Sequence, residues 1–326
     1  MLYFFSLLPI LCYLLLLRQT DVFRVMQWRR VTSSIAYGMA CAAILWAYSL
    51  CWKALHDGQG WQATWISPVL EEIMKAMILI YFIRKHRMAF LCEAVIYGAS
   101  VGGGFALLEN ILYIQLCPDM ALGTAIIRGF GTALLHMGCT SLIVSLALVL
   151  NKHWQLISFI PSIMIHWLHN LQPFSPFVQL FVVLVVFLII FMVIDILDNR
   201  RITRWMDVSL SDDVSLLASI RRGELSSTKA GIYLKDIGIH FEREVFFDMI
   251  MYVRLYLELS LAAKSRLMLR ESGLKMPETE EQRKIHEANV EELRQLRLRI
   301  PLLGRRLLMP IIHETAANEW VLTNKL

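Results

Sequence analysis

The feature that most constrains this chain is a succession of apolar stretches, each about as long as a lipid bilayer is thick. A transmembrane helix needs roughly 20 mostly apolar residues. Between Met1 and Asp198 the chain offers seven such segments: Leu2–Leu17, Ser33–Lys53, Ile66–Ile83, Phe90–Ile114, Leu122–Leu150, Trp154–Leu171 and Phe174–Leu197. The sequence therefore predicts an all-α, polytopic membrane protein with about seven transmembrane helices.

The character of the chain changes after Asp198, where charged residues replace the apolar runs. Residues 243–258 carry their charges on one arc at 100° per residue, which predicts an amphipathic helix. A second charged helical pattern covers Glu278–Arg299 and ends at Pro301. We therefore expect a transmembrane domain over residues 1–198 and a small helical cytoplasmic domain over residues 199–326.

Lys and Arg residues predict the orientation, because loops rich in them stay on the cytoplasmic side. The loops after the first, third and fifth segments and the stretch after the seventh hold Arg18, Arg24, Arg29, Arg30, Arg84, Lys85, Arg87, Lys152, Arg200, Arg201 and Arg204. The intervening loops hold only Lys53. Seven alternating segments thus predict an outside N-terminus and a cytoplasmic tail.

The formal net charge of +5 needs no nucleic-acid partner. Arg and Lys residues beside membrane segments face anionic lipid, and this accounts for a mild positive balance. The expected surroundings are the lipid bilayer.

Small residues form a stripe in the fourth segment. Ala94, Gly98 and Gly102 are spaced four apart on one helix face. Small residues at this spacing let membrane helices approach closely. We expect close packing here, which also bears on the position of the nearby Glu109.

Ionisable residues inside membrane segments are costly and are functional by default. They cluster in the third to sixth segments, together with two asparagines: Glu71, Glu72, Lys75, Glu109, Asn110, Arg128, His136, His166, His169 and Asn170. Each one alone has a structural interpretation, such as a charge pair, a snorkelling side chain or a hydrogen bond between helices. Their occurrence on four successive segments favours a functional site.

The third segment carries Glu71-Glu72-x-x-Lys75. Glu71 and Lys75 are four apart in the favoured order, and Glu72 points about 100° away from Glu71. The two acids therefore have different roles: one pairs with Lys75 and the other faces a reacting centre.

The other three segments carry one polar motif each: Phe105-x-x-x-Glu109-Asn110-x-x-Tyr113, then Arg128 with His136, then His166-x-x-x-Asn170. His166 and Asn170 are four apart, so they share a helix face, and a His and an Asn side by side suit an oxyanion site. In the predicted topology all four motifs lie in the outer half of the bilayer.

Taken in order, these motifs resemble those of PrsW-type intramembrane proteases, within the wider superfamily of CAAX-prenyl and bacteriocin-processing proteases. The resemblance covers roughly residues 68–170 and leaves the tail out. It implies peptide-bond hydrolysis in or beside a bacterial plasma (inner) membrane. It also implies a membrane-anchored protein substrate, such as an anti-sigma factor cut first on its outer side.

The resemblance also implies roles for the residues. In the wider superfamily the first acid of the paired-Glu motif activates water together with a His, and the last motif stabilises the oxyanion. Glu71 would then be the general base and His166 with Asn170 the oxyanion pair. Glu109 stands where many relatives have His, so His136 is the candidate for positioning the water.

The resulting candidates fall into two groups. The catalytic candidates are Glu71, Glu72, His136, His166 and Asn170. The residues expected to support them are Lys75, Glu109, Asn110 and Arg128.

Three alternatives remain. A zinc protease could use His136, His166 and His169 as ligands with water, although no HExxH motif is present and a metal-free mechanism is preferred. A proton-coupled transporter also places acids and histidines in its membrane segments. A non-catalytic scaffold that binds membrane segments is the third.

Overall fold

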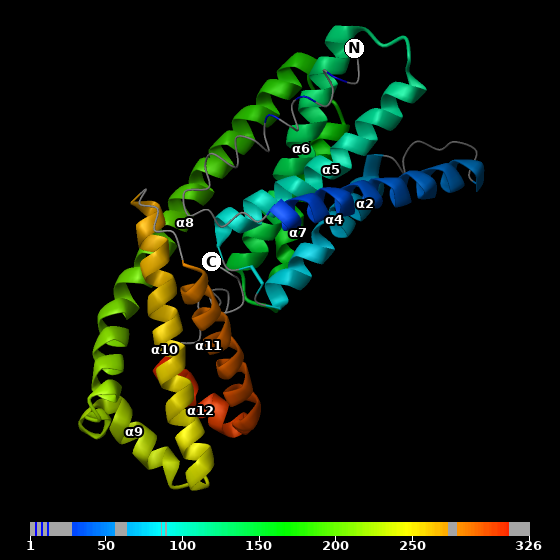
Figure 1. The fold of residues 1–326 in the computed structure, drawn as a ribbon. Coiled ribbons are helices and arrows are strands. Elements are labelled where there is room, and N and C mark those ends of the chain that lie inside the picture. Colours follow the sequence, from blue (N-terminus) through cyan, green and yellow to red (C-terminus); the bar gives the residue numbers. More distant parts are fainter. Residues whose placement is uncertain are drawn as a thin grey trace. The chain divides into compact units, whose positions relative to one another are not determined.

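The computed structural model describes residues 28–55, 64–85, 87–88, 90–272 and 279–312, together with Phe4, Leu8 and Cys12. Every regular element in these ranges is a helix (Figure 1). The predicted first segment, Leu2–Leu17, lies almost wholly outside the described residues. The all-α prediction is confirmed for the part of the chain that is described.

The chain divides into two compact units, residues 1–199 and residues 200–326. The first unit holds α2, α4, α5, α6, a 3₁₀ turn η1, α7 and the apolar part of α8. Their bounds are Trp28–Leu55, Ser67–Arg84, Leu91–Leu116, Leu122–Val149, Gln155–Ser158, Phe159–Asn170 and Pro176–Arg221.

The second unit holds the rest of α8, the 3₁₀ turn η2 and helices α9 to α12. Their bounds are Leu225–Ser227, Lys229–Gly238, Arg243–Glu271, Glu280–Arg299 and Leu302–Ile312. Helices α10 and α11 confirm the two helical patterns expected in the tail, and Thr279 begins α11 with a capping box to Gln282. An apolar cluster that includes Met249, Tyr256 and Leu308 forms the core of this unit.

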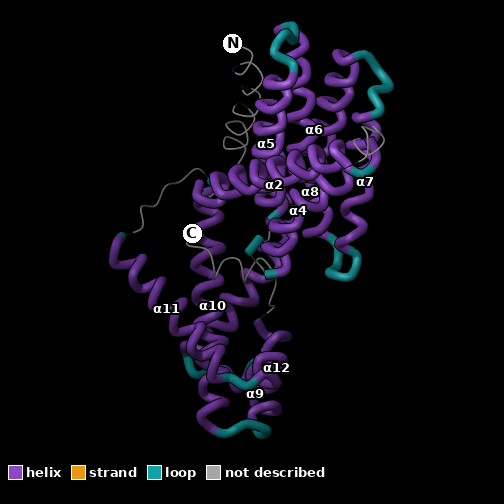
Figure 2. Tube along the Cα trace, turned by 90° about the vertical axis from the view of Figure 1, so that its right-hand side faces the viewer, coloured by secondary structure: helices purple, strands orange, loops and turns teal. Residues whose placement is uncertain are grey.

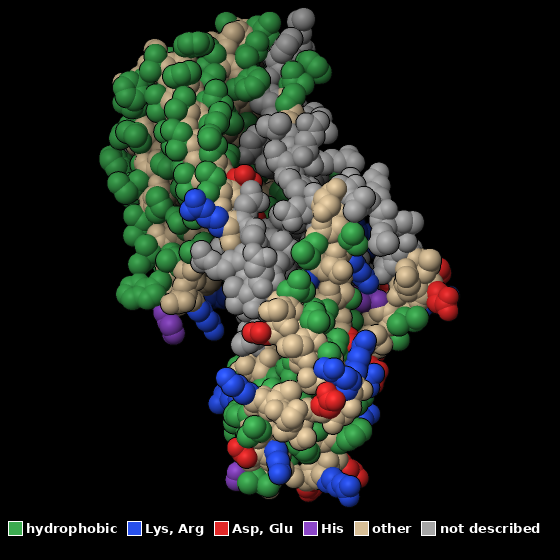
Figure 3. All heavy atoms as spheres, turned by 90° about the vertical axis from the view of Figure 1, so that its left-hand side faces the viewer, with side chains coloured by type: hydrophobic (Ala, Val, Ile, Leu, Met, Phe, Trp, Pro, Cys, Tyr) green, Lys and Arg blue, Asp and Glu red, His purple; other side chains and the backbone are tan. Residues whose placement is uncertain are grey.

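Four helical segments in the described residues are long and apolar enough to cross a membrane: Trp28–Leu55, Leu91–Leu116, Leu122–Val149 and Pro176–Asp198. On the face in Figure 3, hydrophobic side chains cover most of the described surface of the first unit, whereas charged side chains gather on the second. The chain is therefore a membrane protein. Seven spans remain a prediction.

The remaining two described segments are helical but differ from a regular span. α4 has 18 residues and carries Glu71, Glu72 and Lys75 near its N-terminus. α7 has only 12 residues. At 1.5 Å per residue it rises about 18 Å, short of the roughly 30 Å of a hydrocarbon core.

Helix α5 forms the centre of the first unit and packs against α6 and α2 (Figure 2). A Cβ atom at Gly98 would lie 2.6 Å from the Cα of Ser141 in α6, and one at Gly102 would clash with the main-chain oxygen of His136. The small-residue stripe is thus confirmed as a close contact between helix backbones. It brings α5 next to the turn of α6 that carries His136.

The N-terminus of α5 is capped from far along the chain. Asp198, at the end of the apolar part of α8, accepts hydrogen bonds from the main-chain N–H groups of Leu91 and Cys92, each at 2.8 Å. A carboxylate at a helix N-terminus satisfies otherwise unpaired donors and matches the helix dipole. This cap joins the end of α8 to the start of α5.

Candidate active site

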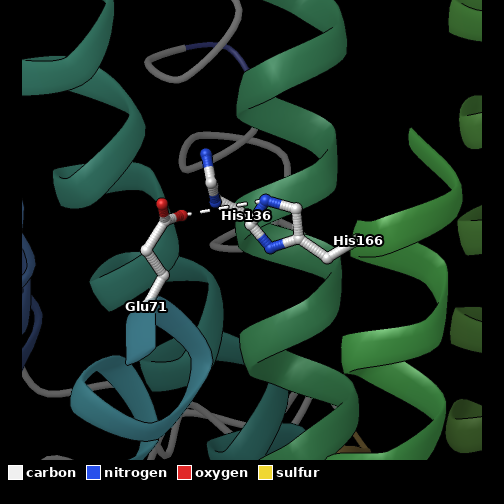
Figure 4. Close-up of side chains that lie close together, drawn as sticks. All are labelled: Glu71, His136 and His166. Atoms are coloured by element: carbon white, nitrogen blue, oxygen red, sulfur yellow. Dashed lines mark ion pairs between the residues drawn. The ribbon is translucent and has the colours of Figure 1, made fainter. Parts of the chain in front are cut away.

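Three side chains from three helices converge in the first unit. Glu71 lies in the first turns of α4, His136 halfway along α6, and His166 near the end of α7 (Figure 4). Each offers one potential ligand atom, and these atoms all lie within 4.8 Å of one another. His136 and His166 are buried, whereas Glu71 is partly exposed. The packing of α4, α6 and α7 therefore brings together three residues that are far apart in the sequence.

Behind this group lies a fully buried ion pair. The Nζ atom of Lys75 is 2.6 Å from Oε1 of Glu72, and neither side chain is exposed to solvent. The pair is spaced i,i+3 within α4, so Lys75 is partnered by Glu72 at 2.6 Å and Glu71 is left to face the other helices. Of the two acids, Glu72 is thus the one that pairs with Lys75.

The same carboxylate oxygen of Glu72 orients His166. Nδ1 of His166 lies 2.9 Å from Oε1 of Glu72, and an ionised carboxylate only accepts hydrogen bonds. Nδ1 therefore carries the hydrogen, and a neutral His166 presents a lone pair at Nε2. That nitrogen is 3.7 Å from Oε2 of Glu71. A neutral His166 is thus an acceptor toward Glu71, and it becomes an oxyanion donor only after taking up a proton.

His136 is held by polar groups on both sides of its ring. Nε2 is 2.7 Å from Oε2 of Glu109, and Nδ1 is 2.9 Å from Nζ of Lys75. Its ring centroid lies 4.8 Å from that of Phe105 and 5.2 Å from that of His166. These contacts fix the plane of the His136 ring.

Glu109 connects His136 to a cation. Its Oε1 is 3.5 Å from a guanidinium nitrogen of Arg128, and that guanidinium lies 3.4 Å from the ring centroid of Tyr113. The Phe105, Glu109 and Tyr113 stripe of α5 therefore faces the site, as an inward-facing stripe would.

A cleft of about 250 Å³ opens over these groups. Its polar lining residues are Tyr48, Ser49, Ser67, Glu71, Glu109, Arg128, Thr132, His136, His166, His169, Asn170 and Gln172. Asn170 follows His166 by one helical turn and shares the cleft with it, at the end of α7. Asn110 is buried behind the lining, where its Oδ1 accepts a hydrogen bond from Thr132 at 2.9 Å.

One wall of the cleft comes from a helix without a motif among the candidates. α2 contributes Leu45, Trp46, Tyr48 and Ser49 to the lining. Tyr48-Ser49 is a polar pair in an otherwise apolar stretch, and this is the signal that could have pointed to it. Thr132 and Gln172 were missed as well, and neither stands in a recognisable motif.

The site holds more negative than positive charge. Glu71, Glu72 and Glu109 supply three carboxylates, whereas Lys75 and Arg128 supply two cations. A buried charge without a partner is costly. The excess negative charge belongs to Glu71, whose partly exposed carboxylate can take up a proton or bind a cation at the cleft.

A catalytic zinc ion usually takes three protein ligands and a water. Glu71 and His166 fit this requirement, because both direct lone pairs at the cleft. His136 does not fit as it stands, because the Lys75 ammonium can only donate to its Nδ1, which leaves the hydrogen on Nε2. His169 lines the cleft but is outside the three-residue group. Glu71 and His166 could thus hold a metal ion as they stand, and His136 could join them only with the hydrogen moved from Nε2.

Comparison with known sequences decides the family. A sequence profile described as PrsW family intramembrane metalloprotease matches residues 23–194, which is more than half of the chain. The chain belongs to the PrsW family. The family assignment rests on the part of the chain that builds the cleft.

A curated relative in this family is Protease PrsW of Bacillus subtilis (strain 168). It is 30% identical over 139 residues, which cover 35% of this chain and 61% of the relative. The chain thus spans less than two thirds of the length of the relative that it matches. No solved structure matches the chain.

Proposed function

We propose that this PrsW-family protein is an intramembrane endopeptidase that cleaves a membrane-anchored protein, with Glu71 as the base that activates water. The observation that carries the proposal is the pair of acceptors at the cleft: Oε2 of Glu71 and Nε2 of His166, 3.7 Å apart. Family membership supports peptide hydrolysis as the reaction.

The two acceptors suit one water molecule, which can donate one O–H to each of them. As the water oxygen attacks the peptide carbonyl, Glu71 takes up its proton. A neighbouring donor then stabilises the negative charge on the carbonyl oxygen, and the Asn170 amide in the same cleft can serve in this way. The peptide C–N bond breaks, and the proton passes to the leaving amine, which gives one carboxyl and one amino product.

His166 takes two successive parts in this scheme. It first accepts a hydrogen bond from water through Nε2. When Glu71 passes the proton taken from water to Nε2, His166 becomes a donor to the oxyanion and then gives that proton to the leaving nitrogen, while Glu72 holds the other ring nitrogen throughout. This order reconciles the acceptor geometry of His166 with an oxyanion role beside Asn170.

The proposed orientation rests on the distribution of Lys and Arg, and the proposed substrate class rests on the resemblance to PrsW-type proteases. We propose the outer face of a bacterial plasma membrane for the cleft, an outside N-terminus, and a cytoplasmic second unit. An anti-sigma factor with a single membrane segment is the proposed type of substrate. A juxtamembrane segment would bring its peptide bond to a cleft near the end of the helices.

The test is cleavage of a reporter with one membrane segment and an outer juxtamembrane stretch. Wild type is compared with Glu71→Gln and His166→Ala at equal membrane levels. The matched controls are Glu224→Gln and His153→Ala, two exposed side chains that are not part of the cleft lining. We expect processing to fall by on the order of 10²-fold or more in the cleft variants and to persist in the controls.

Each arm is repeated with a zinc chelator. Processing that survives the chelator supports the metal-free scheme, and loss restored by added zinc would assign the reaction to a metal ion instead. Unchanged processing by Glu71→Gln would remove Glu71 from the mechanism. A wild type that is inert toward every such reporter would favour a transporter or a scaffold.

A further inference from the structure

Lys75 makes more contacts than a charge pair requires. Its Nζ atom is 2.6 Å from Oε1 of Glu72, 2.9 Å from Nδ1 of His136, and 4.7 Å from the ring centroid of Phe105. An ammonium group has three hydrogens and no lone pair. The three neighbours are a carboxylate, an imidazole nitrogen and the face of an aromatic ring, and each of them attracts one N–H.

The contact with His136 determines which ring nitrogen bears hydrogen. Because Lys75 only donates, Nδ1 of His136 must accept, and a neutral ring then carries its hydrogen on Nε2. Nε2 lies 2.7 Å from Oε2 of Glu109, and an ionised carboxylate can only accept a hydrogen bond. The two contacts agree, so His136 is a donor toward Glu109.

His166 has the opposite polarity. Its Nδ1–H donates to Glu72, so its Nε2 is an acceptor at the cleft. The two histidines lie with their ring centroids 5.2 Å apart and receive their opposite orientations from the two members of one ion pair. Glu72 makes Nε2 of His166 an acceptor, and Lys75 makes Nε2 of His136 a donor.

We propose that Lys75 is a positioning residue that keeps the ring hydrogen of His136 on Nε2, making His136 a donor to Glu109 rather than a third metal ligand. The inference deepens the proposed function and rests on it for its effect on catalysis. The position of the ring hydrogen itself is measured without substrate, so the two can fail separately.

Removal of the ammonium has a defined consequence. Without Lys75, the buried carboxylate of Glu72 loses its cation, and the nearby Nδ1 of His136 loses its donor. The ring hydrogen of His136 can then move to Nδ1, while Glu72 stays without its cation. Nε2 then carries a lone pair, with Glu109 taking up a proton to remain its partner at 2.7 Å, and it can join Glu71 and His166 as a third ligand when a metal ion displaces that proton. The variant Lys75→Met should therefore bind zinc more tightly than wild type.

The experiment uses the full-length chain, labelled with ¹⁵N-histidine, reconstituted in nanodiscs and freed of metal by a chelator. ¹⁵N spectra distinguish a ring nitrogen that bears hydrogen from one with a lone pair, and His136→Asn assigns the His136 signals among the nine histidines of the chain. The variants are Lys75→Met and Lys75→Arg. The matched control is Lys264→Met, which removes another fully buried lysine from a carboxylate 2.7 Å away.

We expect wild type to show hydrogen on Nε2 of His136 and a lone pair on Nδ1. In Lys75→Met the hydrogen should move to Nδ1, and the dissociation constant for zinc should fall by about tenfold, a typical size for groups that orient a ligand. Lys75→Arg, which still donates, should keep the wild-type pattern, and Lys264→Met should leave the His136 signals unchanged.

The wild-type spectrum needs no variant to fold and can overturn the proposal by itself, if Nε2 of His136 proves to carry the lone pair. A Lys75→Met spectrum identical to wild type would show that Glu109 alone keeps the hydrogen on Nε2 of His136, and would remove Lys75 from this role. An unchanged zinc affinity in Lys75→Met would contradict the claim that Lys75 prevents His136 from binding a metal ion. Lost reporter cleavage with an intact Nε2–H signal would leave the proposal standing and question the proposed function instead.

Discussion

Each unit of the molecule buries one lysine against a carboxylate, and the two pairs differ in what they connect. In the second unit, Nζ of Lys264 in α10 lies 2.7 Å from Oδ2 of Asp213 in α8, so this pair ties two helices together across 51 residues. In the first unit, Glu72 and Lys75 lie one turn apart in α4, so this ion pair lies within a single helix.

The difference separates structure from chemistry. Burying two charges is expensive, and a pair between helices can recover part of that cost by fixing tertiary packing. A pair within one helical turn gains little in this way, since the helix already places its members together. Glu72 and Lys75 instead direct their remaining hydrogen-bonding capacity at two histidines of the cleft. The Glu72–Lys75 pair is therefore best explained by its role in the site, and the Asp213–Lys264 pair by its role in the fold.

The largest expected effect is on stability, when either pair is broken from one side. Lys75→Met and Lys264→Met each leave a buried carboxylate without its cation, which costs about 3–5 kcal/mol. Unfolding of each unit in detergent, followed by hydrogen exchange, should show the loss in the unit that carries the change. Equal stability of both variants and wild type would show that neither carboxylate is ionised in the folded protein.

The next largest effect separates the two pairs by activity. Replacing a whole buried pair with apolar residues is often neutral for stability. Lys264→Met/Asp213→Leu should thus recover both stability and reporter cleavage. Lys75→Met/Glu72→Leu should recover stability but stay on the order of 10²-fold slower, about 2.7 kcal/mol in barrier, because His136 and His166 lose their orientation. Full cleavage by Lys75→Met/Glu72→Leu would show that the Glu72–Lys75 pair, like the Asp213–Lys264 pair, serves the fold alone.

A smaller effect compares one substitution in the two units. Gly102→Ala places a Cβ against the main chain of α6 at His136, whereas Gly304→Ala meets the Cγ2 atom of Ile300 at 2.9 Å. A side chain can yield and a helix backbone cannot, so Gly102→Ala should cost about 1–3 kcal/mol and also slow cleavage. Gly304→Ala should cost less and leave the cleavage rate unchanged. Thermal unfolding and the reporter assay measure both, and the reverse order would contradict this account of the packing.

The smallest effect concerns helix caps. Asp198→Asn removes a charge from a cap that joins α8 to α5, and Thr279→Ala removes a local cap of α11. Each should cost about 0.5–2 kcal/mol. Only Asp198→Asn should loosen two elements at once, so hydrogen exchange should rise at the start of α5. Exchange confined to α8 would refute the link between them.

Much of the site could be predicted because the information is local. Helical spacing placed Glu71, Glu109, His136 and His166 on successive helices, and the glycine stripe of α5 indicated its close packing. The charged patterns of the tail likewise predicted α10 and α11.

What could not be predicted depends on contacts between distant segments. Lys75 lies within reach of both Glu71 at i+4 and Glu72 at i+3, and the sequence alone does not choose between them. The choice follows from His136 and His166, which approach Glu72 and Lys75 from α6 and α7. The part of α2 in the cleft was hidden for the same reason, because an apolar helix face looks alike whether it borders lipid or a cavity.

The cap at Asp198 also has a mechanical meaning. It clamps the last turn of the apolar part of α8 to the first amides of α5, and the second unit begins immediately afterwards. A displacement of α8 at Asp198 therefore acts on the N-terminal end of α5. Glu109 lies 18 residues further along the same helix, or about 27 Å at 1.5 Å per residue. α5 thus carries the cap at its first turn and a residue of the cleft in its second half.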